Sequence, residues 1–94
     1  MEQLRLEGSD AIAHGDARAL RATVSAAAER FRLSPRQAEV LALVCEGLTN
    51  FQIGERLLVT HATVVDHVRQ LRDRTNARNR THLAAIAIRC QRDR

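Results

Sequence analysis

The residues best suited to chemistry lie on one face of a predicted helix over 60–75. Apolar residues on its other side, Val64, Val68 and Leu71, follow the i, i+4, i+7 spacing of a buried helical stripe. The opposite face carries small, donor and acceptor side chains: His61, Ala62, Val65, Asp66 and Arg69. Such a mixture suits contact with the edges of base pairs in the major groove of DNA.

Other chemistries find little support in the sequence. The four histidines include no i, i+4 pair that would hold a metal ion, and there is no Cys-x-x-Cys pair or glycine-rich phosphate loop. Ser25 and Ser34 have no neighbouring base that would activate a hydroxyl. We therefore expect no catalytic residues, no metal site and no cofactor.

We call this face of the 60–75 helix the reading face. A second helix, which must hold it in place, is predicted directly before the 60–75 helix, from Thr49 to Leu57. Thr49 can cap the free amides of the first turn, and Gln52 completes a capping box. Gly54 costs about 1 kcal/mol inside a helix relative to alanine, which close approach of a second helix would explain. Residues 58–60 form the turn and Thr60 caps the helix that follows, so the pattern predicts a helix-turn-helix.

A further helix is predicted before this pair, over 34–47. Ser34 is its cap, Pro35 takes the first helical position and Gln37 completes a capping box. Gly47 suits the left-handed conformation that ends a helix.

A last helix is predicted over about 80–90. Asn76 ends the preceding helix, and Asn79 caps this one. Leu83, Ala84, Ile86, Ala87 and Cys90 give it an apolar side, which Ile88 widens beyond what one small core should need. One short helix cannot easily bury all of them in a single chain, so we predict that this side forms a dimer interface. The alternative is simple packing on the helix over 34–47.

Residues 1–31 form a predicted N-terminal helical extension. Asp16 can cap a helix over roughly 17–31, whose apolar stripe is Leu20, Val24, Ala27 or Ala28, and Phe31. We interpret it as an extra helix that packs across the following domain. A surface for a partner, or the remnant of a linker to an upstream domain, is the alternative.

Charge is distributed unevenly along the 94 residues. Residues 1–31 carry four Arg and five acids, or −1, whereas residues 32–94 carry eleven Arg and six acids, or +5. The basic part coincides with the helix-turn-helix, as expected for binding nucleic acid. Two Phe and no Trp or Tyr supply little stacking for unpaired bases, so double-stranded DNA is the predicted partner.

The sequence also predicts where the protein acts. No apolar run approaches the 18 residues of a membrane span, so no membrane partner is expected. The two cysteines do not suggest a disulfide framework, which favours the cytoplasm.

The stretch over about 33–87 resembles the LuxR/GerE/FixJ-type helix-turn-helix domain from end to end. The motifs that carry the resemblance are Leu33-Ser34-Pro35-Arg36 with Glu39-Val40-Leu41, Glu46-Gly47-Leu48-Thr49-Asn50, Ile53, Leu57, Thr63-Val64, His67-Val68, and Arg78-Asn79-Arg80-Thr81 with Leu83. The resemblance implies an all-α fold, a four-helix domain over 32–90 preceded by the extra N-terminal helix. It also implies that the 60–75 helix enters the major groove and that the 80–90 helix pairs two subunits over an inverted repeat.

The resemblance further implies which residues bind phosphate. They are Asn50, Thr63, His67, Arg78 and Arg80. The chain departs from the family at Val65, where lysine is frequent, and at Phe51, where a charged residue is usual. Val65 could contact a thymine methyl group, and Arg69 is the best candidate for a guanine contact.

We therefore predict a sequence-specific transcriptional regulator that binds double-stranded DNA as a homodimer, with RNA polymerase or another regulator as a further partner. Val65 and Asp66 give weight to an alternative, a protein-interaction module with weak DNA affinity that docks a partner regulator. A sigma-factor region of related type is a third possibility, against which the 78–81 segment and the helix after it argue.

Overall fold

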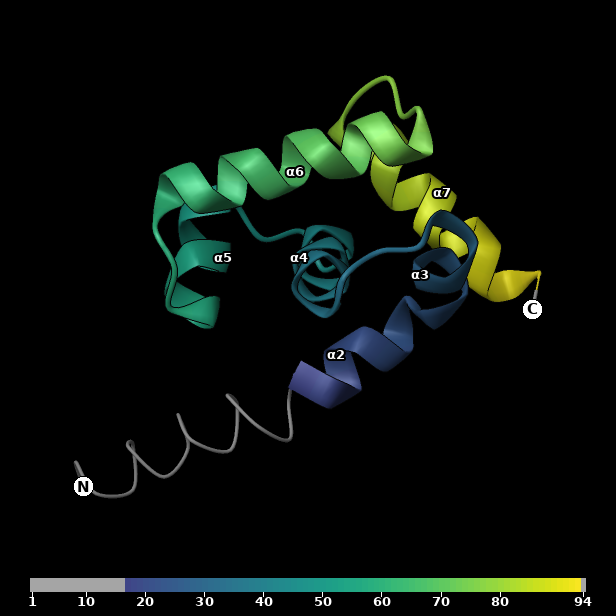
Figure 1. Ribbon diagram of the computed structural model, residues 1–94, viewed down its shortest axis with the longest axis horizontal. Coiled ribbons are helices and arrows are strands. Elements are labelled where there is room, and N and C mark those ends of the chain that lie inside the picture. Colours follow the sequence, from purple (N-terminus) through teal and green to yellow (C-terminus); the bar gives the residue numbers. More distant parts are fainter. Residues whose placement is uncertain (1–16, 94) are drawn as a thin grey trace.

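The computed structural model describes residues 17–93, which form helices and no strand. The helices are α2 (Ala17–Thr23), α3 (Ser25–Phe31), α4 (Pro35–Cys45), α5 (Asn50–Leu57), α6 (His61–Thr75) and α7 (Arg80–Arg92) (Figure 1). This confirms the all-α prediction. The predictions made for residues 1–16, including Asp16 as a cap, lie outside the described residues. Within the described part, no helix is long and apolar enough to cross a membrane.

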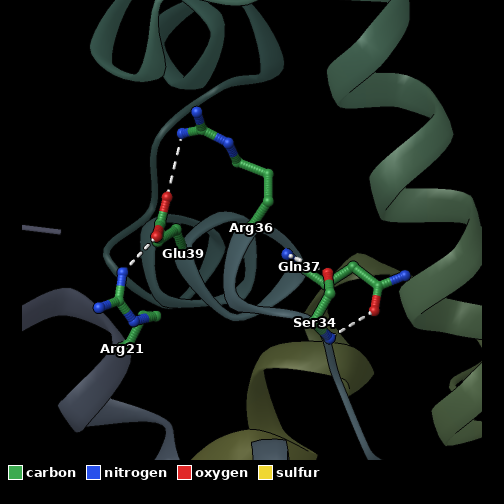
Figure 2. A network of polar contacts seen from close by, with 5 residues as sticks. All are labelled: Arg21, Ser34, Arg36, Gln37 and Glu39. Atoms are coloured by element: carbon green, nitrogen blue, oxygen red, sulfur yellow. Dashed lines mark hydrogen bonds and ion pairs between the residues drawn. The ribbon is translucent and has the colours of Figure 1, made fainter. Parts of the chain in front are cut away.

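The helices begin where the capping residues predict. In α4 the Gln37 amide donates to Ser34 Oγ at 3.1 Å, and the Ser34 amide donates to Gln37 Oε1 at 3.0 Å (Figure 2). Thr49 and Gln52 form the same reciprocal pair at the start of α5. Satisfying these orphan amides fixes where each helix begins. Gly47, with φ of 91°, ends the α4 segment as predicted.

Helix α4 lies at the centre of the fold, seen end-on between α6 and α2 in Figure 1. It packs against α2, α6 and α7, and its Val40, Leu41 and Leu43 are fully buried. Ile53 of α5 and Leu71 of α6 complete the same core. Because α4 supports α6 directly, the core holds the predicted reading face in place.

The single helix predicted over 17–31 is interrupted in the structure. Val24 leaves the helical conformation at φ −125° and ψ 24°, and its amide donates to Arg21 O at 3.2 Å. The break lets α2 pack on α4 while α3 packs on α7. Apolar spacing alone could not reveal this change of direction, because Leu20 before the break, Val24 at the break and Ala27 after it are all buried.

The extension shares one core with the rest of the chain and is also held by polar contacts. Figure 2 shows Glu39 of α4 between Arg21 of α2, at 2.6 Å, and Arg36 of its own helix, at 3.0 Å. From the C-terminal end of α6, Arg74 Nη1 donates to Phe31 O at 3.2 Å and to Arg32 O at 3.1 Å. The extension therefore contacts both the central helix and the helix that carries the predicted reading face.

Gly54 is required by the turn of the helix-turn-helix. A Cβ at this position would lie 2.9 Å from the backbone oxygen of Val59 and 3.7 Å from Val64 Cγ2. The sequence predicted close approach of a second helix, but the nearest group is a carbonyl of the turn. A side chain at this position would therefore force the turn to shift.

Candidate nucleic-acid interface

The five residues predicted to read bases line the outer side of α6, beginning at its first residue. Four are exposed and Val65 is half-buried, whereas Val64 and Leu71 are fully buried on the opposite side. The exposed members are His61, Ala62, Asp66 and Arg69. The structure therefore brings the five together on one accessible face, as predicted for a helix that reads a groove.

Thr60 and Thr63 fix the start of this face. The Thr63 amide donates to Thr60 Oγ1 at 3.2 Å, and the two hydroxyl oxygens lie 2.8 Å apart. Thr60 is therefore the cap of α6, as predicted. Thr63, a predicted phosphate residue, is half-buried, and its hydroxyl shares a hydrogen bond with the hydroxyl of Thr60.

Arg69 is paired with Asp66 on the reading face. The Nη1 and Oδ1 atoms are 3.3 Å apart, and both side chains are 67% exposed. Exposed pairs of this kind contribute only about 0–1 kcal/mol. Arg69 can therefore leave Asp66 for a base or phosphate at small energetic cost.

Arg80 joins the first turn of α7 to the start of α5. Its Nη1 donates to Asn50 Oδ1 at 2.7 Å, and its Nη2 donates to Leu48 O. Two of the residues predicted to bind phosphate are thus in direct contact. Burial lowers the pKa of Arg80 from its ordinary value, yet an arginine remains charged in proteins. The pair presents a fixed positive group beside a helix N-terminus, where phosphate binds favourably.

The predicted phosphate residue Arg78 lies in the loop before α7, with its side chain exposed. Its backbone is held on both sides: its amide donates to His82 Nδ1 at 3.0 Å, and its carbonyl accepts from Arg72 Nη2 at 2.6 Å. Sequence reasoning placed neither contact. A histidine three residues after a cap position is the signal that could have found the first.

His67 is half-buried on the flank of α6. Its Nδ1 is buried without a hydrogen-bond partner among the described residues. Because Nδ1 is buried, the predicted phosphate contact would have to use the other ring nitrogen, Nε2.

Phe51 and His61 form a contact that the sequence pattern did not indicate. The two rings are stacked, with centroids 4.1 Å apart and an angle of 18° between their planes. Phe51 is nevertheless 69% exposed. An aromatic pair therefore lies at the N-terminal end of the reading face.

The residues predicted to form a dimer interface divide into two groups. Leu83, Ala87 and Cys90 are buried within a single chain, whereas Ala84 and Ile86 are half-buried. A single chain therefore covers more of this helix than expected, because α4 packs on one side of α7 and α3 on another. The dimer interface itself stays a prediction. Ile88, which widens the apolar side of the helix but was not among the predicted interface residues, is 47% exposed.

Cys45 lies where α4 meets α7. Cys45 is half-buried and its Sγ lies 3.9 Å from Ala84 O. Burial raises the pKa of the Cys45 thiol to about 11, so it stays protonated and weakly nucleophilic at neutral pH. Residues 17–93 contain no group of three or more His, Cys, Asp or Glu side chains that could hold a metal ion.

Comparison with known proteins gives a consistent result. Residues 32–87 match the family described as "Bacterial regulatory proteins, luxR family". The chain is 40% identical over 58 residues to the transcriptional activator protein BjaR1 of Bradyrhizobium diazoefficiens, covering 62% of this chain and 24% of that protein. It is 39% identical over 57 residues to the transcriptional regulatory protein LiaR of Bacillus subtilis, covering 61% of this chain and 27% of that protein.

A third relative is the two-component response regulator PprB of Pseudomonas aeruginosa, 47% identical over 53 residues, or 56% of this chain and 19% of that protein. The chain thus spans about a quarter of the length of these relatives or less. No solved structure matches the chain.

Proposed function

Because the chain belongs to the luxR family of bacterial regulatory proteins, we propose that it binds double-stranded DNA with α6 in the major groove. The observation that carries the proposal is the exposed face of α6, which runs from His61 to Arg69. The opposite side of the helix is buried in the core through Val64 and Leu71. The first residues of a recognition helix are those that meet base edges.

Phosphate binding would come from the two flanks of this face. Thr63 and His67 lie along α6 itself, and the Arg80–Asn50 pair lies at the start of α5. Arg78 adds an exposed side chain in the loop between α6 and α7. Contacts to phosphate fix position and orientation on the duplex, while the α6 face supplies the sequence preference.

We infer that the protein regulates transcription as a homodimer on an inverted-repeat operator, in the cytoplasm. The relatives carry the names of a transcriptional activator, a transcriptional regulatory protein and a response regulator. A two-fold dimer would match the symmetry of an inverted repeat. The two chains would contact each other through the side of α7 that includes Ala84, Ala85 and the exposed Ile88.

Arg69→Ala tests the reading face. We expect preference at a single base pair to relax by roughly 5- to 150-fold, because a bidentate arginine–guanine contact is worth about 1–3 kcal/mol of discrimination. Binding of the selected duplex and of its single-base variants would be measured by fluorescence anisotropy. Arg92→Ala removes the same charge from the exposed end of α7 and should leave the preference unchanged. An equal loss on every duplex would show that Arg69 binds backbone rather than base.

Ile88→Glu tests the proposed dimer surface. The side chain is 47% exposed, so a carboxylate there should leave the fold intact while disrupting an apolar contact between two α7 helices. Light scattering should report a mass reduced to that of one chain, with unchanged helical circular dichroism. If the wild type is dimeric and the variant keeps the dimer mass, the interface lies elsewhere.

A further inference from the structure

Phe51 is a large apolar side chain for which the fold has no evident use. It is 69% exposed, the second residue of α5, and it does not belong to the apolar core. Its ring stacks against the ring of His61. The contact therefore joins the first turn of α5 to the first residue of α6.

The geometry of the stack determines what His61 can do. The rings are nearly parallel, at 18° and 4.1 Å, so Phe51 covers one face of the imidazole. An imidazole donates and accepts hydrogen bonds through nitrogens that lie in the plane of its ring. A partner on the face therefore restricts rotation of the ring and leaves its edge available. The stack covers a face of the ring, so it does not occupy the edge that carries the two nitrogens.

The geometry points to Phe51 as a positioning residue that presents the edge of His61 to one base pair. This inference rests on the proposed function of α6 as the recognition helix. His61 is the first residue of that helix, the end that meets base edges in helix-turn-helix complexes. A freely rotating histidine would lose conformational entropy on contacting a base, and the stack reduces that loss beforehand.

An aromatic side chain at position 51 would act on DNA binding differently from a charged one. A charged side chain would bind any phosphate and favour all sequences alike. Phe51 cannot neutralise a phosphate, but it can orient a neighbour that discriminates between bases. The departure from the usual family residue then changes specificity rather than general affinity.

The test uses Phe51→Leu, which keeps apolar bulk without an aromatic face, and Phe51→Tyr, which keeps the face. Binding of the wild type, each variant, His61→Ala and the Phe51→Leu/His61→Ala double variant would be measured on the selected duplex and its single-base variants. We expect Phe51→Leu and His61→Ala each to lose about tenfold of the preference at the same base pair. The double variant should lose no more than His61→Ala alone, and Phe51→Tyr should behave as wild type.

A second readout needs no DNA. The carbon-bound ring protons of His61 should be shifted upfield by the Phe51 ring in the free wild type and in Phe51→Tyr, and this shift should vanish in Phe51→Leu. Unchanged His61 resonances in Phe51→Leu would show that the two rings are not stacked in the free protein.

The remaining outcomes separate this inference from the proposed function. A uniform loss on all duplexes, additive losses in the double variant, or full preference in Phe51→Leu would overturn the positioning role while leaving DNA recognition by α6 in place. A wild type without sequence preference would overturn the proposed function, and the positioning role with it.

Discussion

Arg80→Ala is expected to weaken binding to every duplex by about the same factor, roughly 10- to 100-fold. Hydrogen bonds to charged groups contribute about 1.5–3 kcal/mol, and each tenfold change in affinity corresponds to 1.4 kcal/mol. Arg80 would supply one phosphate contact directly. It also holds Asn50, a second predicted phosphate ligand, through the 2.7 Å hydrogen bond to Oδ1. Both contacts are independent of sequence, so the pattern of preference should survive.

The measurement is the affinity of the variant against salt concentration. Losing one phosphate contact should make the slope of log K against log salt shallower by about 1. Arg80→Lys should fall between wild type and alanine, because a lysine keeps the charge but lacks the planar fork that reaches Asn50 Oδ1 and Leu48 O together. Arg92→Ala is the matched control and should change affinity little. A loss confined to one base pair would contradict the assignment of Arg80 to the backbone.

Leu41→Ala should lower the free energy of unfolding by about 2–5 kcal/mol, the range for buried leucines truncated to alanine. Leu41 lies at the centre of α4 and is fully buried. Helix α4 packs against both α2 and α6, so a cavity in it should weaken the packing of the whole domain. For a chain of 94 residues this is a large fraction of a total that is typically about 5–15 kcal/mol.

Urea unfolding followed by circular dichroism would measure this loss. Leu58→Ala makes the same chemical change at a side chain that is 83% exposed in the turn of the helix-turn-helix. It should alter stability by no more than about 0.5 kcal/mol. If the two variants lost similar stability, α4 would not be the centre of the core.

The fold could be predicted to a large extent because its start and stop signals are local. Ser34, Thr49, Thr60 and Asn79 each cap the helix that the sequence assigned to them, and Asn76 adopts the left-handed conformation at φ 63°. A cap depends only on residues within one turn, so it can be recognised without knowledge of tertiary contacts.

Features that depend on two distant segments could not be predicted in this way. The break at Val24 exists because α2 and α3 pack on different helices, and no local pattern encodes that choice. The burial of Cys90 likewise depends on α3, which packs on α7. The sequence predicted that the extension packs across the domain, but not which helix it covers.

The candidate site shows the same division. The face of α6 followed from helical spacing, whereas the contact of Arg80 with Asn50 spans thirty positions of sequence and the Phe51–His61 stack spans ten. The same applies to Arg74, which ties the C-terminal end of α6 to the last carbonyls of α3. Each of these contacts joins residues too far apart in the sequence for helical spacing to predict.

Selection of bound sequences from a random duplex library, followed by salt titration of the best duplex, tests most directly whether α6 reads DNA. We expect a two-fold-symmetric sequence, and binding that weakens with salt at a slope of about −4 or steeper, as several phosphates are neutralised. No enrichment, or binding that is indifferent to sequence or to salt, would contradict recognition by α6. The exposed surfaces of the extension and of α7 would then be the sites to examine for a protein partner.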